Sequence, residues 1–213
     1  MIKIETFVFN LFSENTFVVW DEETKEAAVI DPGMSSISEE ELIEDFISKN
    51  NLQIKCLINT HCHIDHILGC NYVKEKYNPK FLVPEKDIPL LQNGKAQASA
   101  FGVEYKEPPK PDKFITEDEE LLLGNSKIKF LFTPGHTPGE YCIYFEEEKI
   151  CITGDVLFRE GIGRTDLWGG DYDRLIRSIE TKLFTLPGDV TIYPGHGEPS
   201  TISHEMTNNP FLE

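Results

Sequence analysis

Apolar and polar residues alternate along the N-terminal part of the chain. The alternation runs over residues 3–9, 16–20 and 27–31, and polar turns separate these segments. Successive side chains of a strand point to opposite faces, so strict alternation is typical of a strand with one buried face. The chain is therefore expected to begin with three strands.

The period changes to that of a helix at residues 36–50, where S-I-S-E-E-E-L-I-E-D-F-I-S-K-N follows the turn D-P-G. Either Ser36 or Ser38 can cap this helix. The apolar stripe expected on its buried face is Ile37, Leu42, Ile43, Phe46 and Ile47. A short buried strand at 54–60 comes next, and a second helix is predicted over residues 65–77.

The remainder of the chain shows the same order of strands first and a helix later. A strand at 81–83 and a short helix at 85–92 precede residues 93–113, which lack a clear pattern and are expected to form a loop or flap. Further strands are predicted near 119–123, 126–132, 140–145, 149–154 and 189–193. Helices are predicted near 171–183 and 200–207. We therefore expect one α+β domain over residues 1–213, built from two β-rich halves.

Composition narrows the class of protein. Hydrophobic residues make up 39% of the 213 residues, which is typical of a soluble globular chain. The apolar runs are too short to span a membrane, and the N-terminus lacks the pattern of a signal peptide. The five cysteines are odd in number and form no C-x-x-C pair, so we expect no disulfide framework and a reducing cytoplasmic location.

The formal net charge of −17 repels the phosphate backbone of nucleic acids, so a nucleic-acid partner is not expected. An anionic ligand would need local positive charge, which a metal site can provide. A small-molecule substrate is the partner that this balance favours.

Metal-ligand residues follow the strand ends. Residues 60–66 read T-H-C-H-I-D-H and contain three of the six histidines. Three more ligand-type residues each lie in a turn after a predicted strand, whereas His204 does not. Loops at one end of a sheet converge on a site that a rigid scaffold holds. The candidate metal ligands are His61, His63, Asp65, His66, His136, Asp155 and His196.

Seven ligands are too many for one zinc ion, which usually takes four or five. They suit two metals that share a bridging carboxylate, and imidazole with carboxylate suits zinc, iron or manganese. Cys62 lies between two ligands and is expected to pack or to be an oxidation liability rather than to bind metal. Asp31, in I-D-P-G, can accept a hydrogen bond that orients a ligand histidine, or can simply form a turn before Pro32.

These residues resemble the metallo-β-lactamase superfamily of binuclear metallohydrolases. T-H-C-H-I-D-H is similar to its H-x-H-x-D-H signature, and the resemblance covers nearly the whole chain. It implies an αββα four-layer sandwich with the site at one edge between two sheets. Residues 154–172 and the ending Y-P-G-H-G…N-P-F-L resemble the glyoxalase II-like (hydroxyacylglutathione hydrolase) branch.

The resemblance also implies a division of the ligands. It assigns His61, His63 and His136 to metal one, Asp65, His66 and His196 to metal two, and Asp155 to the bridge. An aspartate at 155 counts against the true β-lactamases, which place a cysteine ligand there. His63 counts against the flavodiiron proteins, which have an acidic residue there.

One departure from glyoxalase II concerns the C-terminus. Glyoxalase II proper adds C-terminal helices with basic residues that hold glutathione. Here 17 residues follow His196, and none is Lys or Arg. We expect no C-terminal glutathione-binding helical domain, and the chain resembles the short subgroup of the branch.

The expected reaction is hydrolysis of a thioester by a hydroxide that bridges two divalent ions, most simply zinc. A thiolate with a conjugate pKa of roughly 8.5 leaves without a strong general acid. Asp65 can also orient the hydroxide. Arg164 either grips an anionic substrate or pairs with Asp166 or Asp171, and a structural role is favoured for Arg159. Tyr105 and Phe101 either cover the substrate or pack.

Other functions stay open. G-R-T-D, residues 163–166, also resembles the persulfide dioxygenases, which use one iron, although Y-P-G-H-G counts against them. A lactone, other ester or phosphodiester hydrolase can use the same metals, and a metal-binding protein without catalysis is the remaining class.

Overall fold

The computed structural model describes residues 1–118 and 121–212. Contacts divide the chain into two compact units, which are described separately. The first comprises Met1–Ile115 with Leu122–Ser126, and the second comprises Thr116–Leu121 with Lys127–Glu213.

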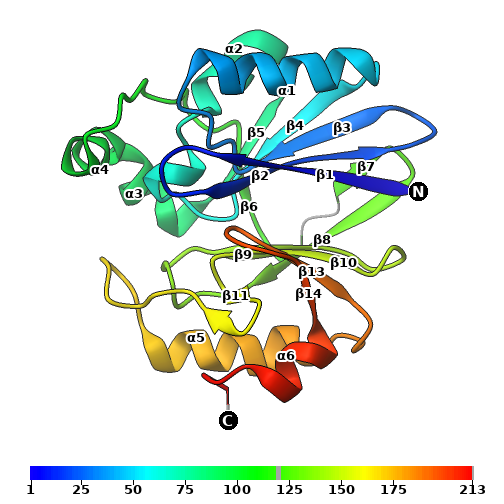
Figure 1. The fold of residues 1–213 in the computed structure, drawn as a ribbon, viewed down its shortest axis with the longest axis vertical. Coiled ribbons are helices and arrows are strands. Elements are labelled where there is room, and N and C mark those ends of the chain that lie inside the picture. Colours follow the sequence, from blue (N-terminus) through cyan, green and yellow to red (C-terminus); the bar gives the residue numbers. More distant parts are fainter. Residues whose placement is uncertain (119–120, 213) are drawn as a thin grey trace. The chain divides into compact units, whose positions relative to one another are not determined.

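Among the described residues, the sheet of the first unit has six strands in the order β1-β2-β3-β4-β5-β6 (Figure 1). Strands β1 to β3 pair antiparallel, and β3 to β6 pair parallel. The five strands predicted for this region are confirmed, and β6 is an addition. The bounds are β1 (Ile2–Phe9), β2 (Glu14–Asp21), β3 (Glu26–Ile30), β4 (Gln53–Ile58), β5 (Lys80–Pro84) and β6 (Lys113–Ile115).

Helix α1 (Ile37–Lys49) begins as predicted, because the Ser36 hydroxyl accepts the backbone N–H of Glu39. Its buried stripe is narrower than predicted. Ile43 and Ile47 are buried, whereas Ile37 and Leu42 are 74% and 54% exposed. Successive helical residues are rotated by about 100°, so Leu42 leaves the buried face when Ile43 occupies it.

The helix predicted over 65–77 is wrong at its start. A short 3-10 turn, η1 (Ile64–His66), is separated from α2 (Cys70–Tyr77). The break falls at Gly69, whose N–H donates to the Pro32 carbonyl at 2.7 Å instead of continuing the helix. A Cβ on Gly69 would lie 2.8 Å from Met34 Cε and 3.0 Å from the Pro32 carbonyl oxygen, so a larger residue would require Met34 to shift.

The prediction of a loop or flap over 93–113 is also wrong in part. The expected short helix at 85–92 is present as η2 (Glu85–Asp87) and α3 (Ile88–Gln92), but α4 (Gly94–Phe101) follows inside the predicted loop. Helix α4 is rich in alanine, which favours helix without giving an apolar stripe. Its first residue packs beneath Tyr105, because a Cβ on Gly94 would lie 2.2 Å from the tyrosine hydroxyl oxygen.

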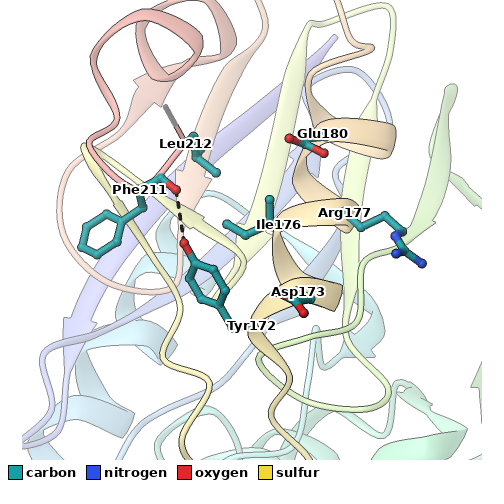
Figure 2. A pocket seen from close by; sticks show the side chains of 7 residues that line it. All are labelled: Tyr172, Asp173, Ile176, Arg177, Glu180, Phe211 and Leu212. Atoms are coloured by element: carbon teal, nitrogen blue, oxygen red, sulfur yellow. Dashed lines mark hydrogen bonds between the residues drawn. The ribbon is translucent and has the colours of Figure 1, made fainter.

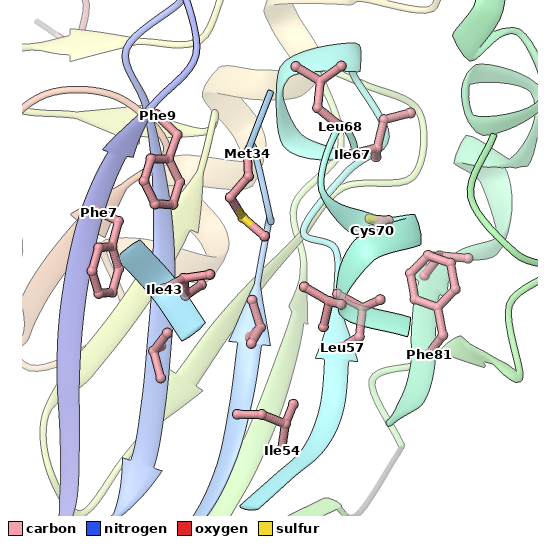
Figure 3. Packing of buried hydrophobic residues seen from close by; sticks show 14 of the residues in the cluster. Phe7, Phe9, Met34, Ile43, Ile54, Leu57, Ile67, Leu68, Cys70 and Phe81 are labelled. Carbon is pink, nitrogen blue, oxygen red and sulfur yellow. The ribbon is translucent and has the colours of Figure 1, made fainter. Parts of the chain in front are cut away.

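The core of the first unit lies between the sheet and helices α1 and α2, with Phe7, Leu57 and Phe81 on strands and Ile43 on α1 (Figure 3). It extends to the segment that carries the histidines. The apolar residues of this segment that join the core are Cys62, Ile64, Ile67 and Leu68. Cys62 is fully buried in this cluster, so its predicted packing role is confirmed.

The second sheet has the order β14-β13-β10-β9-β8-β7 among the described residues. Strands β10 and β13 pair parallel, and β8, β9 and β10 pair antiparallel. The predicted strands are confirmed, except that residues 119–120 of the first lie outside the described part of the chain. The bounds are β7 (Leu121–Leu123), β8 (Ser126–Phe132), β9 (Tyr141–Phe145), β10 (Ile150–Gly154), β13 (Thr191–Pro194) and β14 (Ser200–Thr201).

A small hairpin of β11 (Leu157–Phe158) and β12 (Gly161–Ile162) lies in the segment after Asp155, where no strand was predicted. Helices α5 (Tyr172–Ser178), its π-helical continuation η3 (Ile179–Leu183) and α6 (Ile202–Asn208) confirm the two predicted helices. Leu175, Ile179 and Ile202 pack from these helices against Cys142, Cys151 and Ile192 of the sheet.

The C-terminal residues lie beside α5 (Figure 2). The Tyr172 hydroxyl donates to the Phe211 carbonyl at 3.5 Å. A cavity of about 290 Å³ opens here, and none of the predicted metal ligands lines it.

No helix in the described residues is both long and apolar enough to cross a membrane. All five cysteines are free and buried.

Candidate metal centre

The first unit carries four of the predicted ligands on one turn after β4. The rings of His61 and His66 are 4.1 Å apart between centroids, and those of His61 and His63 are 5.0 Å apart. Asp65 Oδ2 lies 3.7 Å from His66 Nε2. His61 and His66 are fully buried, and the Asp65 side chain is 14% exposed. One short segment thus supplies four of the predicted ligands.

Side-chain amides fix the shape of this turn. The Asn59 amide donates to the His66 carbonyl at 2.7 Å. The Asn10 amide, from the turn between β1 and β2, donates to the carbonyls of Gly33 and Asp65 at 2.9 and 3.1 Å. Because these bonds hold carbonyl groups, they fix the backbone of the turn that carries the predicted ligands.

Asp31 forms the turn considered for it, and its carboxylate lies beside a predicted ligand histidine. It has φ of +48° at the end of β3, so it forms the turn before Pro32. Its carboxylate accepts the backbone N–H and the hydroxyl of Thr60 at 2.7 and 2.5 Å. Its Oδ2 lies 3.2 Å from His66 Nδ1. The potential ligand atoms of Asp31, His61 and His66 all lie within 4.8 Å of one another.

The Thr60 hydroxyl settles which nitrogen of His61 carries the proton. Its own proton goes to Asp31, so its oxygen accepts from His61 Nδ1, 3.1 Å away. The lone pair of His61 therefore lies on Nε2. A hydrogen-bond acceptor on one ring nitrogen is the usual arrangement for a metal-ligating histidine.

The second unit carries three predicted ligands at three strand ends. His136 follows β8, Asp155 follows β10 and His196 follows β13. Asp155 Oδ2 lies 3.5 Å from His136 Nε2 and 3.7 Å from His196 Nε2. His136 Nδ1 donates to the Arg164 carbonyl at 2.7 Å, which leaves Nε2 with the lone pair.

Gly154 and Gly163 allow the Asp155 turn to form. Gly154 has φ of +50°, and a Cβ on Gly163 would lie 1.7 Å from the Asp155 carbonyl oxygen. The Asp155 N–H donates to the Glu140 carboxylate at 2.7 Å. The close approach of Gly163 and the bond to Glu140 fix the backbone on both sides of the carboxylate.

The spacing of donor atoms within each unit fits metal coordination. Two ligands that bind one tetrahedral ion at ~2.1 Å are about 3.4 Å apart. The pairs Asp65–His66, His136–Asp155 and His196–Asp155 lie at 3.7, 3.5 and 3.7 Å. The imidazole and carboxylate donors are those that zinc, iron and manganese accept.

Two buried carboxyl groups beside the ligands were missed in the sequence. Glu14 Oε1 lies 3.9 Å from His66 Nδ1, and complete burial raises the pKa of Glu14 well above its ordinary value. Glu140 is also fully buried and holds Asp155. The only signal in the sequence is a glutamate at or next to the start of an apolar strand.

Arg164 forms a bidentate pair with Asp166, with both bonds at 2.7 Å, and not with Asp171. This pairing raises the pKa of Arg164 and lowers that of Asp166 to about 2. Asp171 instead caps α5 through the N–H of Arg174. Arg159 is exposed.

The aromatic residues proposed for the flap pack within the first unit. Tyr105 packs against the core, and its hydroxyl donates to the Leu91 carbonyl at 3.4 Å. Burial raises the pKa of Tyr105. Phe101 is 52% exposed and meets the ring of Phe12 edge-on. His204 lies on α6, and its Nε2 is 2.9 Å from Glu160.

Comparison with known proteins places the chain in a family. The model of the metallo-β-lactamase superfamily matches residues 10–196, which include all seven predicted ligands. The chain therefore belongs to the metallo-β-lactamase superfamily, and its predicted α+β fold of this type is confirmed. It is a hydrolase of this superfamily with His/Asp clusters that can hold metal ions.

Relatives and solved structures agree on this family. The chain is 39% identical over 213 residues to the hydroxyacylglutathione hydrolase GloC of Haemophilus influenzae, covering 99% of this chain and 98% of that protein. It is 36% identical to the probable metallo-hydrolase YqgX of Bacillus subtilis, with 86% of each covered.

Two solved structures share 30% identity with the chain. The BLEG-1 B3 metallo-β-lactamase has a TM-score of 0.88, with 99% of each chain covered. TTHA1623 in a di-iron-bound form has a TM-score of 0.86, covering 98% of this chain and 100% of that one.

Proposed function

We propose that this chain is a binuclear metal-dependent hydrolase of thioesters of the S-acylglutathione type. The observation that carries the binuclear centre is the position of Asp155, whose Oδ2 lies 3.5 and 3.7 Å from two histidine nitrogens. A carboxylate between two imidazoles suits a bridge. The similarity to a hydroxyacylglutathione hydrolase over the full chain supports the thioester as substrate.

In this proposal, His61, His63 and His136 would hold metal one, and Asp65, His66 and His196 would hold metal two. Asp155 would be the shared ligand. Zinc is the metal proposed, and the donor set also suits iron or manganese. The di-iron form of TTHA1623 is an example of a similar chain that binds two metal ions.

When bound, two divalent ions supply an activated water nucleophile and Lewis-acid stabilisation of the developing oxyanion. The residues of the chain supply orientation. Asp65 holds one oxygen towards the ligand cluster, and its second oxygen can accept a proton from the attacking water. The Asp31 carboxylate lies 3.2 Å from His66 Nδ1, and the Arg164 carbonyl accepts from His136 Nδ1. In each ring Nε2 would then be the nitrogen that holds metal.

The leaving group explains why no further acid is needed. A thiolate leaves as the anion, because its conjugate pKa of ~8.5 is close to neutral pH. Substrate contacts by Arg164 and Tyr105 stay predictions. The exposed pair of Arg164 with Asp166 and the packing of Tyr105 favour structural roles for both side chains.

The test is elemental analysis of the purified protein together with hydrolysis of S-lactoylglutathione. We expect about two equivalents of divalent metal and thioester turnover that Asp155→Ala abolishes. His204→Gln is the matched control, because His204 is a histidine outside the proposed ligand set. One equivalent of iron, with oxygen consumed on glutathione persulfide and no thioester turnover, would replace this proposal with a persulfide dioxygenase.

A second candidate is β-lactam hydrolysis, which the similarity to the BLEG-1 B3 metallo-β-lactamase favours. The test assays three substrates on one preparation of the protein: S-lactoylglutathione as the thioester, a simple lactone as the ester, and a chromogenic cephalosporin as the β-lactam amide. The thioester should have the highest kcat/KM of the three. A cephalosporin or lactone that exceeds it would change the substrate class and leave the metal centre in place.

A further inference from the structure

Glu14, the first residue of β2, is a completely buried carboxyl group behind the ligand turn. Its Oε2 lies 2.9 Å from the Thr16 hydroxyl. Its Oε1 has no hydrogen-bond donor among the described residues and lies 3.9 Å from His66 Nδ1. A buried carboxyl oxygen that faces an imidazole without a donor of its own needs an explanation.

A second buried carboxylate faces the same ring nitrogen. Asp31 Oδ2 lies 3.2 Å from His66 Nδ1, while the opposite nitrogen, Nε2, faces Asp65 at 3.7 Å. In the described part of the chain, no Lys or Arg forms an ion pair with Glu14 or Asp31. Two buried acidic groups therefore converge on one histidine that the proposed function makes a ligand of metal two.

The backbone is built to allow this convergence. A Cβ on Gly33 would lie 2.0 Å from Glu14 Oε2, 2.6 Å from Asn10 Nδ2 and 2.7 Å from the Asp65 carbonyl oxygen. The Gly33 N–H donates to the Thr16 hydroxyl at 2.8 Å. Any larger residue at position 33 would displace the glutamate, the asparagine or the ligand turn.

Burial of a carboxylate without a cation is unfavourable, because the charge loses its hydration. A cation on the far side of His66 would balance the charge. An acidic group behind Nδ1 also holds the proton there and makes Nε2 a stronger donor to metal. Both effects act through the imidazole and neither requires Glu14 to touch the metal.

We propose that Glu14 is a positioning residue for metal two, which acts with Asp31 through His66 to strengthen metal binding at Nε2. This inference rests on the metal centre of the proposed function. It does not depend on the identity of the substrate.

The test compares Glu14→Gln with wild type by competition between the protein and a chelator for zinc. Glutamine keeps the shape and can still contact Thr16, but it has no acidic group. We expect the affinity for one of two zinc ions to fall ~10–100-fold, the range found when outer partners of metal ligands are removed. The stability of the metal-free protein in urea should stay equal or rise, because a buried acidic group has been removed.

Glu205→Gln is the matched control. Glu205 is also buried, and its carboxylate bonds to Ser200 and Asn209 and to none of the proposed ligands. Its replacement should leave both zinc affinities unchanged. If Glu14→Gln fails to fold, Thr16→Val provides the second variant, because it removes the hydroxyl beside Glu14 and should weaken the same zinc ion by a smaller factor.

Equal zinc affinities in Glu14→Gln and wild type would overturn the inference. A loss of metal-free stability that accompanies the loss of affinity would also overturn it, because that result indicates a purely structural role. Failure of the proposed thioester hydrolysis would give a different result from failure of this inference. Wild-type protein would then bind two zinc ions and hydrolyse no thioester, while the effect of Glu14→Gln on zinc affinity would persist.

Discussion

The candidate metal ligands of the two units are brought together in two different ways. In the first unit, His61, His63, Asp65 and His66 come from one turn, braced by core residues between them. In the second unit, His136, Asp155 and His196 come from three strand ends that only the pairing of the sheet brings together. The first set depends on local backbone shape and the second on long-range pairing.

This difference determines which changes should damage the site. A local turn fails when its own bonds or the core beneath it are altered. Ligands on separate strands fail individually, and the sheet continues to hold the others. Asp155 is the exception, because in its proposed bridging role one residue would serve both metal ions.

The largest expected effect separates Asp155 from a ligand to one ion. Asp155→Ala should lower the metal content from two ions to one or none and reduce thioester turnover by well over ~100-fold, beyond the cost of losing an outer partner. His63→Ala should remove one ion at most. Metal analysis after gel filtration measures both. Equal losses in the two variants would show that Asp155 does not bridge.

The next effect concerns the cores behind the two ligand sets. Ile67→Ala and Leu175→Ala each remove a fully buried side chain and should each destabilise the protein by about 2–5 kcal/mol. Ile67 directly follows the proposed ligand His66, so its loss should also weaken zinc binding. Leu175 contacts the Gly135 turn through its backbone, which alanine preserves.

Urea unfolding of the metal-free variants and zinc competition distinguish these two sites. The comparison between the units would be broken if Leu175→Ala weakened zinc binding as much as Ile67→Ala. Similar stabilities with different zinc affinities would support a locally built first set.

A smaller effect is expected at Asp31. Asp31→Asn should lower zinc affinity at His66 by ~10–100-fold, because the amide cannot hold the Nδ1 proton as a carboxylate does. Asp31 also accepts from Thr60, whose hydroxyl orients His61. The affinity for both zinc ions should therefore fall, whereas Glu14→Gln should weaken only one. Titration with a zinc indicator at fixed pH measures this. Weaker binding of one ion alone would show that Asp31 acts through His66 and not through His61.

The smallest effect is expected at Arg164. Arg164→Ala should change kcat/KM by no more than a few fold, because His136 bonds to the backbone carbonyl that alanine retains. The pKa of Asp166 should rise from about 2 towards its ordinary value, and NMR titration of the carboxyl carbon follows it. A large rise in KM for an anionic thioester would instead show that Arg164 binds substrate.

The pair of Arg164 and Asp166 also predicts how the stability of the protein changes with pH. The folded-state pKa of Asp166 is lowered, so its contribution to stability is present above the unfolded pKa and is lost as pH falls towards 2. Removal of Arg164 should abolish this part of the acid dependence. The effect is small because both side chains are exposed.

The sequence predicted much of the fold because alternation and helical periods are local signals. The strands and the cap at Ser36 follow from them. The break at Gly69 does not, because it depends on a bond to the carbonyl of Pro32, far away along the chain. Helix α4 has no apolar stripe to show it, and Ala98 is buried by packing that the sequence does not display.

The candidate site divides in the same way. The ligand-type residues could be found from their positions after strands. The nitrogen through which His136 donates could not be predicted. Its acceptor is the backbone carbonyl of Arg164 and not a side chain. Glu14 was missed because a glutamate at the start of a strand gives no sign that it is buried beside His66.

Ligand and core positions alternate along the turn, with His61, His63 and Asp65 separated by the buried Cys62 and Ile64. The segment therefore has a strict length requirement and a looser requirement for composition. A conservative apolar replacement at 62 or 64 changes only the volume of the core. Insertion of a single residue among them would displace the ligand side chains relative to one another and disturb the packing of Cys62 and Ile64 in the core. We expect natural variation in this family of turns to consist of substitutions rather than of insertions or deletions.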